Sequence, residues 1–143
     1  MPTPMSILFV CNQNSIRSPM AAELLKSRVR PEVGVDSAGL YEGAPDPFLP
    51  SILKEIGLSV GNVAPKSLEG MDLSGFHNIV ALTSEAVEAL SVKVPTENLA
   101  YWPTENPTDS YGARDQILDA YRRVRGDLTE RIAECFGDFF AKT

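Results

Sequence analysis

The hydrophobic and polar positions of the chain follow two alternating patterns. Short runs rich in apolar and β-branched residues occupy positions 6–11, 33–38, 78–82 and 98–102, and runs of this length are typical of buried strands. After most of them, apolar residues recur every three or four positions, which indicates helices with one buried face. Strands that alternate with helices predict an α/β fold with a parallel sheet.

The first helix is expected to begin at Ser18. Serine is a good N-cap, and Pro19 suits the first helical position because the first turn does not use the N–H that proline lacks. The helix is expected to run to about Val29, since Pro31 follows.

The next two helices carry similar start signals. Asp46 followed by Pro47 repeats the cap-then-proline pattern, and Gly57 ends the apolar stripe that follows. Thr83 or Ser84 is expected to cap a third helix after the third strand.

The last helix has the most regular pattern in the chain. Its apolar positions are separated by three or four residues, which follows one face of a helix. These positions are Ile117, Tyr121, Val124, Leu128, Ile132, Cys135 and Phe139. We therefore expect Cys135 to pack in the core, where a free cysteine behaves as a small hydrophobe.

Together these elements predict a three-layer α/β/α fold with a four-stranded parallel sheet, in a single domain spanning residues 1–143. Ligands of such sheets bind outside the carboxyl ends of the strands, near the point where the strand order reverses. Cys11 ends the first strand. The topology therefore predicts a site at Cys11.

Composition narrows the range of partners. The chain has 143 residues and a net charge of −6, which argues against general binding to nucleic acids or anionic membranes. No apolar run approaches 18 residues and the first residues do not resemble a secretory signal, so we expect a cytoplasmic protein. Two cysteines and one histidine favour reduced thiols and argue against a zinc site.

The segment from Cys11 to Arg17 carries the candidate chemistry. A thiol becomes a good nucleophile when it ionises, and helix N-termini and neighbouring cations favour the thiolate. The segment places Cys11 before a helix start and beside Arg17, whose forked guanidinium suits a tetrahedral oxyanion. Backbone N–H groups turned inward would complete an anion nest. The alternative, an inert strand-end cysteine and a surface arginine, fits the strand-loop-helix context less well.

The residues between and after these two ends form the candidate oxyanion cradle. Asn14 tolerates a positive φ, which a tight loop with inward N–H groups requires. Ser18 is expected to lie beside the sulfur and to stabilise it as a leaving group. The candidate substrate-binding residues are Asn12, Gln13, Asn14, Ser15, Ile16, Arg17 and Ser18.

The segment from Ile7 through Cys11, and from Arg17 to Glu23, resembles the signature of low-molecular-weight protein tyrosine phosphatases and of the related thioredoxin-coupled arsenate reductases. The resemblance extends to residues 36–39 and to Asp46–Pro47. It implies that Cys11 is the nucleophile and that Arg17 binds the phosphate. It also implies that Asn14, Ser18 and Ser37 form the hydrogen-bond network that holds the loop, and that no metal or organic cofactor takes part.

The chain departs from this family at the general acid. The aspartate of the family aligns with Asn106, and an amide cannot protonate a leaving oxygen at neutral pH. General acid catalysis is typically worth about 10²–10⁴ in rate, so a slow phosphatase that favours good leaving groups is expected. Glu105 and Asp109 are candidate replacements, each displaced along the loop.

Other departures concern thiols and aromatic residues. Leu82 and Ala89 stand where the reductases need relay cysteines, and Ile16 replaces the second loop cysteine of many phosphatases. Thr108 and Asp109 replace the aromatic residues that sandwich phosphotyrosine. A wall from Tyr41 or Trp102, or Tyr111 further along, is an alternative, although such residues are often simple packing.

The sequence therefore predicts a hydrolase for phosphomonoesters, with protein phosphotyrosine as the leading substrate and a cysteinyl-phosphate intermediate. The expected partners are a phosphorylated protein or small phosphomonoester, inorganic phosphate or another oxyanion. Two alternatives stay open: a single-cysteine arsenate reductase that uses an external thiol, and a non-catalytic module that binds phosphate or phosphoproteins.

Overall fold

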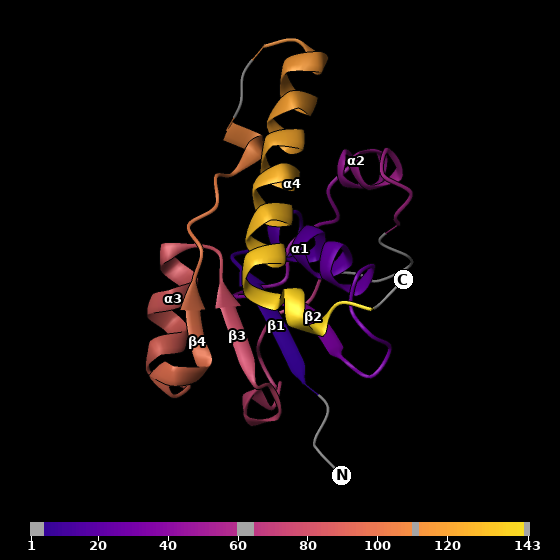
Figure 1. Ribbon diagram of the computed structural model, residues 1–143. Helices are drawn as coiled ribbons and strands as arrows, with labels where there is room; N and C mark the ends of the chain where they lie inside the picture. Colours follow the sequence, from indigo (N-terminus) through magenta and orange to yellow (C-terminus); the bar gives the residue numbers. More distant parts are fainter. Residues whose placement is uncertain (1–4, 60–64, 110–111, 142–143) are drawn as a thin grey trace.

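A parallel sheet of four strands forms the centre of the computed structural model, which describes residues 5–59, 65–109 and 112–141 (Figure 1). The strands are β1 (Ser6–Cys11), β2 (Gly34–Gly39), β3 (Asn78–Ala81) and β4 (Leu99–Tyr101). Their order across the sheet is β2-β1-β3-β4, and all three pairs are parallel. The predicted strands are therefore confirmed; the bounds of β1 match, and those of the other three differ by at most one residue.

Helices cover both faces of this sheet. The helices α1 (Arg17–Lys26), α2 (Leu49–Lys54) and α4 (Arg114–Phe136) lie on the face that carries Ile7 and Phe9. The helix α3 (Ser84–Ser91) lies on the face that carries Leu8 and Val10. Short 3₁₀ turns occupy Leu73–Gly75, Thr96–Asn98, Pro107–Asp109 and Gly137–Phe139. The predicted three-layer α/β/α arrangement is confirmed.

The predicted start of α1 is wrong by two residues. Ile16 occupies the N-cap position and the helix begins at Arg17, with no side chain capping it. Ser18 is fully buried at the second helical position, and its hydroxyl faces Cys11 instead of the helix end. Pro19 is thus the third helical residue, still within the turn whose N–H groups have no helical partner.

Asp46 and Thr83, the predicted start signals of α2 and α3, both accept hydrogen bonds from N–H groups near the start of these helices. The carboxylate of Asp46 accepts hydrogen bonds from the N–H groups of Phe48 and Leu49, just before α2 begins. Thr83 caps α3, because its hydroxyl oxygen accepts from the N–H of Ala86 at 3.0 Å.

The prediction that Cys135 packs in the core is wrong. The buried stripe of α4 continues from Ile132 to Phe136, one helical turn on, and the Phe136 ring lies 6.4 Å from that of Phe9. Cys135 is therefore turned to solvent. Phe139 lies beyond the end of the helix and is partly buried.

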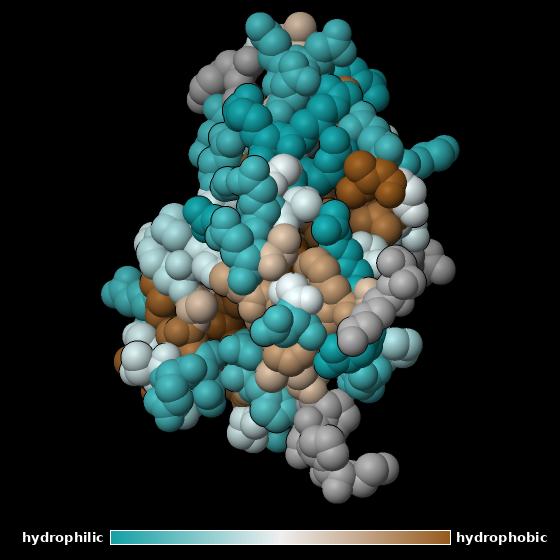
Figure 2. Space-filling view, in the orientation of Figure 1, coloured by the Kyte–Doolittle hydropathy of each residue, from teal (hydrophilic) through white to brown (hydrophobic). Residues whose placement is uncertain are grey.

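The described residues contain no helix with the length and hydropathy needed to cross a bilayer. Nor do they hold a group of three or more histidine, cysteine or acidic side chains placed to bind a metal ion. On the face in view, hydrophilic residues cover the first half of α4 (Figure 2).

Candidate active site

The candidate site lies at the point where the order of the strands across the sheet reverses. The strand β2 lies on one side of β1 and β3 on the other, so the connections diverge at the carboxyl end of β1. Cys11 is the last residue of β1, and residues 12–16 lead from it into α1. The carbonyl oxygens of residues 11, 12 and 13 accept hydrogen bonds from the N–H groups of Leu40, Tyr41 and Gly43 respectively, each at 3.0 Å. The loop is thus fixed along the segment that follows β2.

Two glycines allow this close approach. A Cβ atom at Gly39 would lie 2.7 Å from the backbone nitrogen of Asn14, and one at Gly43 would lie 2.6 Å from the Cβ of Gln13. Neither distance leaves room for a side chain. The loop therefore sits against the backbone of the 39–43 segment.

The thiol of Cys11 contacts the hydroxyl of Ser18. The side chain of Cys11 is buried, and its Sγ lies 3.0 Å from Ser18 Oγ. Asn14 Nδ2 donates to the same hydroxyl at 2.7 Å, so Ser18 has one hydrogen left to donate, either to sulfur or to the Ala38 carbonyl at 3.3 Å. Because a thiolate is only an acceptor, Ser18 can turn this hydrogen to the sulfur when Cys11 ionises.

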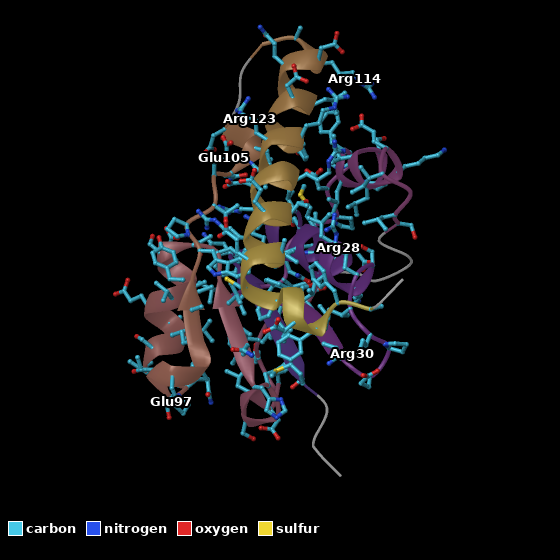
Figure 3. The ribbon with its side chains drawn as sticks, in the orientation of Figure 1. Arg28, Arg30, Glu97, Glu105, Arg114 and Arg123 are labelled. Carbon is cyan, nitrogen blue, oxygen red and sulfur yellow. The ribbon has the colours of Figure 1, made fainter. Side chains whose placement is uncertain are left out.

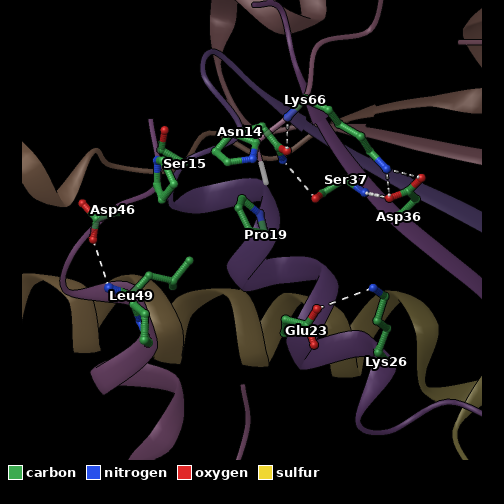
Figure 4. A pocket seen from close by; sticks show the side chains of 13 residues that line it. Asn14, Ser15, Pro19, Glu23, Lys26, Asp36, Ser37, Asp46, Leu49 and Lys66 are labelled. Atoms are coloured by element: carbon green, nitrogen blue, oxygen red, sulfur yellow. Dashed lines mark hydrogen bonds and ion pairs between the residues drawn. The ribbon is translucent and has the colours of Figure 1, made fainter. Parts of the chain in front are cut away.

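Asn14 connects the loop to its surroundings (Figure 4). Its φ is 55°, and its side chain is almost fully buried. Besides Ser18, its Nδ2 donates to Ser37 Oγ at 2.9 Å, while its Oδ1 accepts from the N–H of Lys66 at 2.9 Å. The predicted contact of Asn14 with Ser18 and Ser37 is therefore present, and Lys66 adds a third partner.

Replacing Asn14 by alanine is expected to lower the free energy of unfolding by about 1–3 kcal/mol, because buried hydroxyl and N–H groups lose their partner. Inorganic phosphate is expected to protect this variant from urea unfolding less than it protects the wild type. Ser37→Ala is the matched control: it removes a single contact of Asn14 and is expected to have a smaller effect. Equal stability and equal protection in Asn14→Ala and wild type would show that this network does not hold the loop.

A cavity of about 240 Å³ opens in front of Cys11. Its walls come from the loop, from the segment before α2 and from the segment after β4. The lining residues are Cys11, Asn12, Gln13, Ser15, Ile16, Arg17, Ala44, Pro45, Asp46, Pro47, Asn106 and Thr108. Among these lining residues, Arg17 is the one basic side chain and Asp46 the one acidic side chain. The set contains no aromatic residue. Asn14 and Ser18 lie behind the loop; Asn14 lines a second cavity of about 170 Å³ there.

The structure brings Asn106 into the cavity with Cys11. Its side-chain oxygen accepts hydrogen bonds from the N–H and the hydroxyl of Thr108, at 3.1 and 2.8 Å. The two candidate replacement acids do not line this cavity. Glu105 pairs with Arg123 of α4, with Nε and Oε1 3.2 Å apart (Figure 3). Asp109 lines an adjacent depression.

Arg17 ties the loop to the segment after β4. Its Nη1 donates to the carbonyl oxygen of Thr104 at 3.1 Å, and its side chain is half-buried. Arg17 and Asn12 also line the adjacent depression, together with Glu85. The pKa of Glu85 is lowered chiefly by its backbone N–H and also by Asn12, Ser84 and the charge of Arg17.

The aromatic residues considered for a substrate wall lie elsewhere. Trp102 packs in the core, with its ring centroid 5.8 Å from that of Phe9. Tyr41 is exposed and does not line the cavity. Tyr111 lies outside the described residues. His77 lies away from the cavity, where its Nδ1 accepts a hydrogen bond from the N–H of Ser6 at the amino end of β1.

Four residues near the loop were not singled out from the sequence as site residues: Asp46, Lys66, Thr83 and Thr104. Thr83 Oγ1 donates to Asn12 Oδ1 at 2.7 Å. Thr83 follows β3 closely, so its position at the carboxyl edge of the sheet was a usable signal. Lys66 offered no such signal, because it lies far from the loop in sequence and in no regular element.

The comparisons with known proteins agree with this architecture. Residues 6–132 match the family model described as low molecular weight phosphotyrosine protein phosphatase. A protein-arginine-phosphatase of Geobacillus stearothermophilus is 30% identical over 142 residues, covering 92% of this chain and 95% of the relative. An arsenate reductase of Bacillus subtilis is 26% identical over 128 residues, covering 90% and 92%.

Solved structures give the same result. An arginine phosphatase from G. stearothermophilus superposes with a TM-score of 0.77 at 25% identity, covering 94% of each chain. An arsenate reductase from Archaeoglobus fulgidus gives a TM-score of 0.74 at 28% identity, covering 92% of this chain and 98% of that one. Because the family model spans most of the sequence, the chain belongs to the low molecular weight phosphotyrosine protein phosphatase family.

Proposed function

We propose that this protein is a hydrolase that removes phosphoryl groups by way of a cysteinyl-phosphate on Cys11. The observation that carries the proposal is the cavity that Cys11 and Arg17 share, with the Ser18 hydroxyl 3.0 Å behind the sulfur. The cavity thus joins a candidate nucleophile and a forked cation, with a hydroxyl donor against the sulfur. Phosphotyrosine on a protein, the substrate after which the family is named, is the first substrate to test.

The proposed reaction has two steps. The Cys11 thiolate attacks phosphorus, the bond from phosphorus to the leaving group breaks, and that group departs with the electron pair. Arg17 and the N–H groups of residues 12–16 hold the equatorial oxygens, where charge builds up in the transition state. Water then attacks the cysteinyl-phosphate and releases phosphate, while Ser18 donates its hydrogen bond to the departing sulfur. Neither step uses a metal or an organic cofactor.

Asn106 sets the expected range of leaving groups. It occupies the cavity wall in the general-acid region, yet it has no proton to give at neutral pH. Phenols, with a pKa of about 10, leave more readily without a proton than alkyl alcohols do. We therefore propose that aryl phosphates react faster than alkyl phosphates.

Arsenate reduction is the second candidate, because several relatives are arsenate reductases. Arsenate has the tetrahedral shape that the proposed cradle would hold. The other cysteine of the chain, Cys135, is exposed on α4, while Phe136 beside it packs on Phe9. Reduction at Cys11 would therefore need an external thiol.

One assay series separates these functions and the third, a module that only binds phosphate. Hydrolysis of phenyl phosphate, thiol-dependent arsenate reduction and binding of inorganic phosphate are measured on the same preparation. We expect hydrolysis, with a phosphoryl group trapped on Cys11 by acid quench and identified by mass spectrometry. Reduction without hydrolysis would establish the arsenate function. Phosphate affinity without turnover in either assay would overturn both enzymatic functions.

A further inference from the structure

The side-chain amide of Asn106 is held in one orientation by Thr108. Its Oδ1 accepts hydrogen bonds from the N–H of Thr108 at 3.1 Å and from the Thr108 hydroxyl at 2.8 Å. A backbone N–H can only donate, so the amide atom that it meets is the oxygen. The Nδ2 group therefore points away from Thr108, and no described residue accepts a hydrogen bond from it.

The segment that carries this amide is fixed relative to Arg17. The carbonyl oxygen of Asn106 accepts from the N–H of Asp109 at 3.0 Å. Two residues before Asn106, the N–H of Thr104 donates to the carbonyl oxygen of Leu82, and its own carbonyl accepts from Arg17 Nη1, each at 3.1 Å. The amide thus has a set place near the guanidinium, and a donor held in advance costs no reorganisation when the reaction occurs.

The leaving group of a bound phosphoryl substrate faces the walls outside the loop, because the loop surrounds the Cys11 sulfur. These walls consist of residues 44–47, Asn106 and Thr108. Alanine and proline side chains offer no donor, both carboxylate oxygens of Asp46 accept hydrogen bonds, and the Thr108 hydroxyl donates to Asn106. Among the described lining residues, Nδ2 of Asn106 is thus the side-chain donor that these walls keep for a ligand.

We infer that Asn106 is a catalytic residue that donates a hydrogen bond from Nδ2 to the leaving oxygen, and that Thr108 is the positioning residue that directs this donor. The inference rests on the proposed function. As the Cys11 thiolate attacks, the sulfur–phosphorus bond forms, the phosphorus–oxygen bond breaks, and the electron pair passes to the leaving oxygen. That oxygen departs as an anion stabilised by Nδ2 and takes a proton from water afterwards. Asn106 keeps both of its amide protons.

The test measures kcat/KM for a series of ring-substituted phenyl phosphates, since kcat/KM includes the step that breaks the phosphorus–oxygen bond. Asn106→Ala is expected to lower kcat/KM for phenyl phosphate roughly 10- to 100-fold, as for loss of a hydrogen bond to a charged group. The loss is expected to be smaller for nitrophenyl phosphate, whose leaving oxygen is less basic. The slope of log kcat/KM against the pKa of the leaving phenol therefore becomes steeper.

Variants of Thr108 test the positioning role. Thr108→Val removes the hydroxyl but keeps the backbone N–H, so it is expected to steepen the slope in the same direction by a smaller amount. Thr108→Ser restores the hydroxyl and is expected to return the slope to that of the wild type. Thr108 is exposed, so neither exchange disturbs the core.

Asn98→Ala is the matched control, because it makes the same exchange just before β4 and outside the cavity. It is expected to leave the slope unchanged. If Asn106 only supported the turn that follows it, Asn106→Ala would slow all substrates by the same factor. Such an unchanged slope, in Asn106→Ala or in Thr108→Val if the first variant does not fold, would overturn the inference alone. Absence of hydrolysis by the wild type would instead overturn the proposed function.

Discussion

Replacing Cys11 by serine is expected to lower the hydrolysis of phenyl phosphate by roughly 10³-fold or more, the scale of loss when a covalent nucleophile is removed. A serine hydroxyl is a far weaker nucleophile than a thiolate, and the described cavity lining offers no histidine to activate it. Steady-state kinetics on the purified variant would measure the loss. The affinity for inorganic phosphate, measured by calorimetry, is expected to persist because Arg17 and the loop are unchanged.

Cys135→Ser is the matched control for this variant. It also exchanges a thiol for a hydroxyl, but on the exposed side of α4, and it is expected to leave kcat and KM unchanged. If Cys11→Ser kept the activity of the wild type, the assigned nucleophile would be wrong. If Cys135→Ser lost activity, the second thiol would have a role in turnover that its exposed position does not suggest.

The strands, the loop and the placement of Cys11 could be predicted from the sequence because each depends on residues that are close in the chain. The apolar run from Ile7 to Val10 defines β1, and the loop follows directly. The contact of Asn14 with Ser37 was expected only through the family resemblance, since 23 positions separate the two residues. The contact with Lys66, 52 positions away, had no local signal and could not be predicted.

The errors at Ser18 and Cys135 have one physical cause. A serine before a proline is a good cap in an isolated helix, but here the hydroxyl is buried against the Cys11 sulfur, so the helix starts earlier. Cys135 fits a helical spacing, but Phe136 lies on the same turn and fills the space against Phe9. In both cases a tertiary contact decides between two arrangements that the local pattern permits.

Asn106→Asp is expected to raise kcat for poor leaving groups by about 10²–10⁴, the usual gain from general acid catalysis. Aspartate has the same shape as asparagine and keeps the acceptor oxygen that binds Thr108. A series of aryl and alkyl phosphates measures the effect as the slope of log kcat against the pKa of the leaving group. The slope is expected to flatten in the variant, with the largest gain for alkyl phosphates.

The pH profile identifies the new acid. Because a general acid acts in its protonated form, kcat of Asn106→Asp is expected to fall as the pH rises through the pKa of the new carboxyl group, a decline absent from the wild type. Glu105→Gln serves as the control. Glu105 pairs with Arg123 outside the cavity, so this variant is expected to leave the slope unchanged. An unaltered slope in Asn106→Asp would mean that position 106 does not face the leaving group. A steeper slope in Glu105→Gln would instead identify Glu105 as the acid, which would require the Glu105–Arg123 pair to open during turnover.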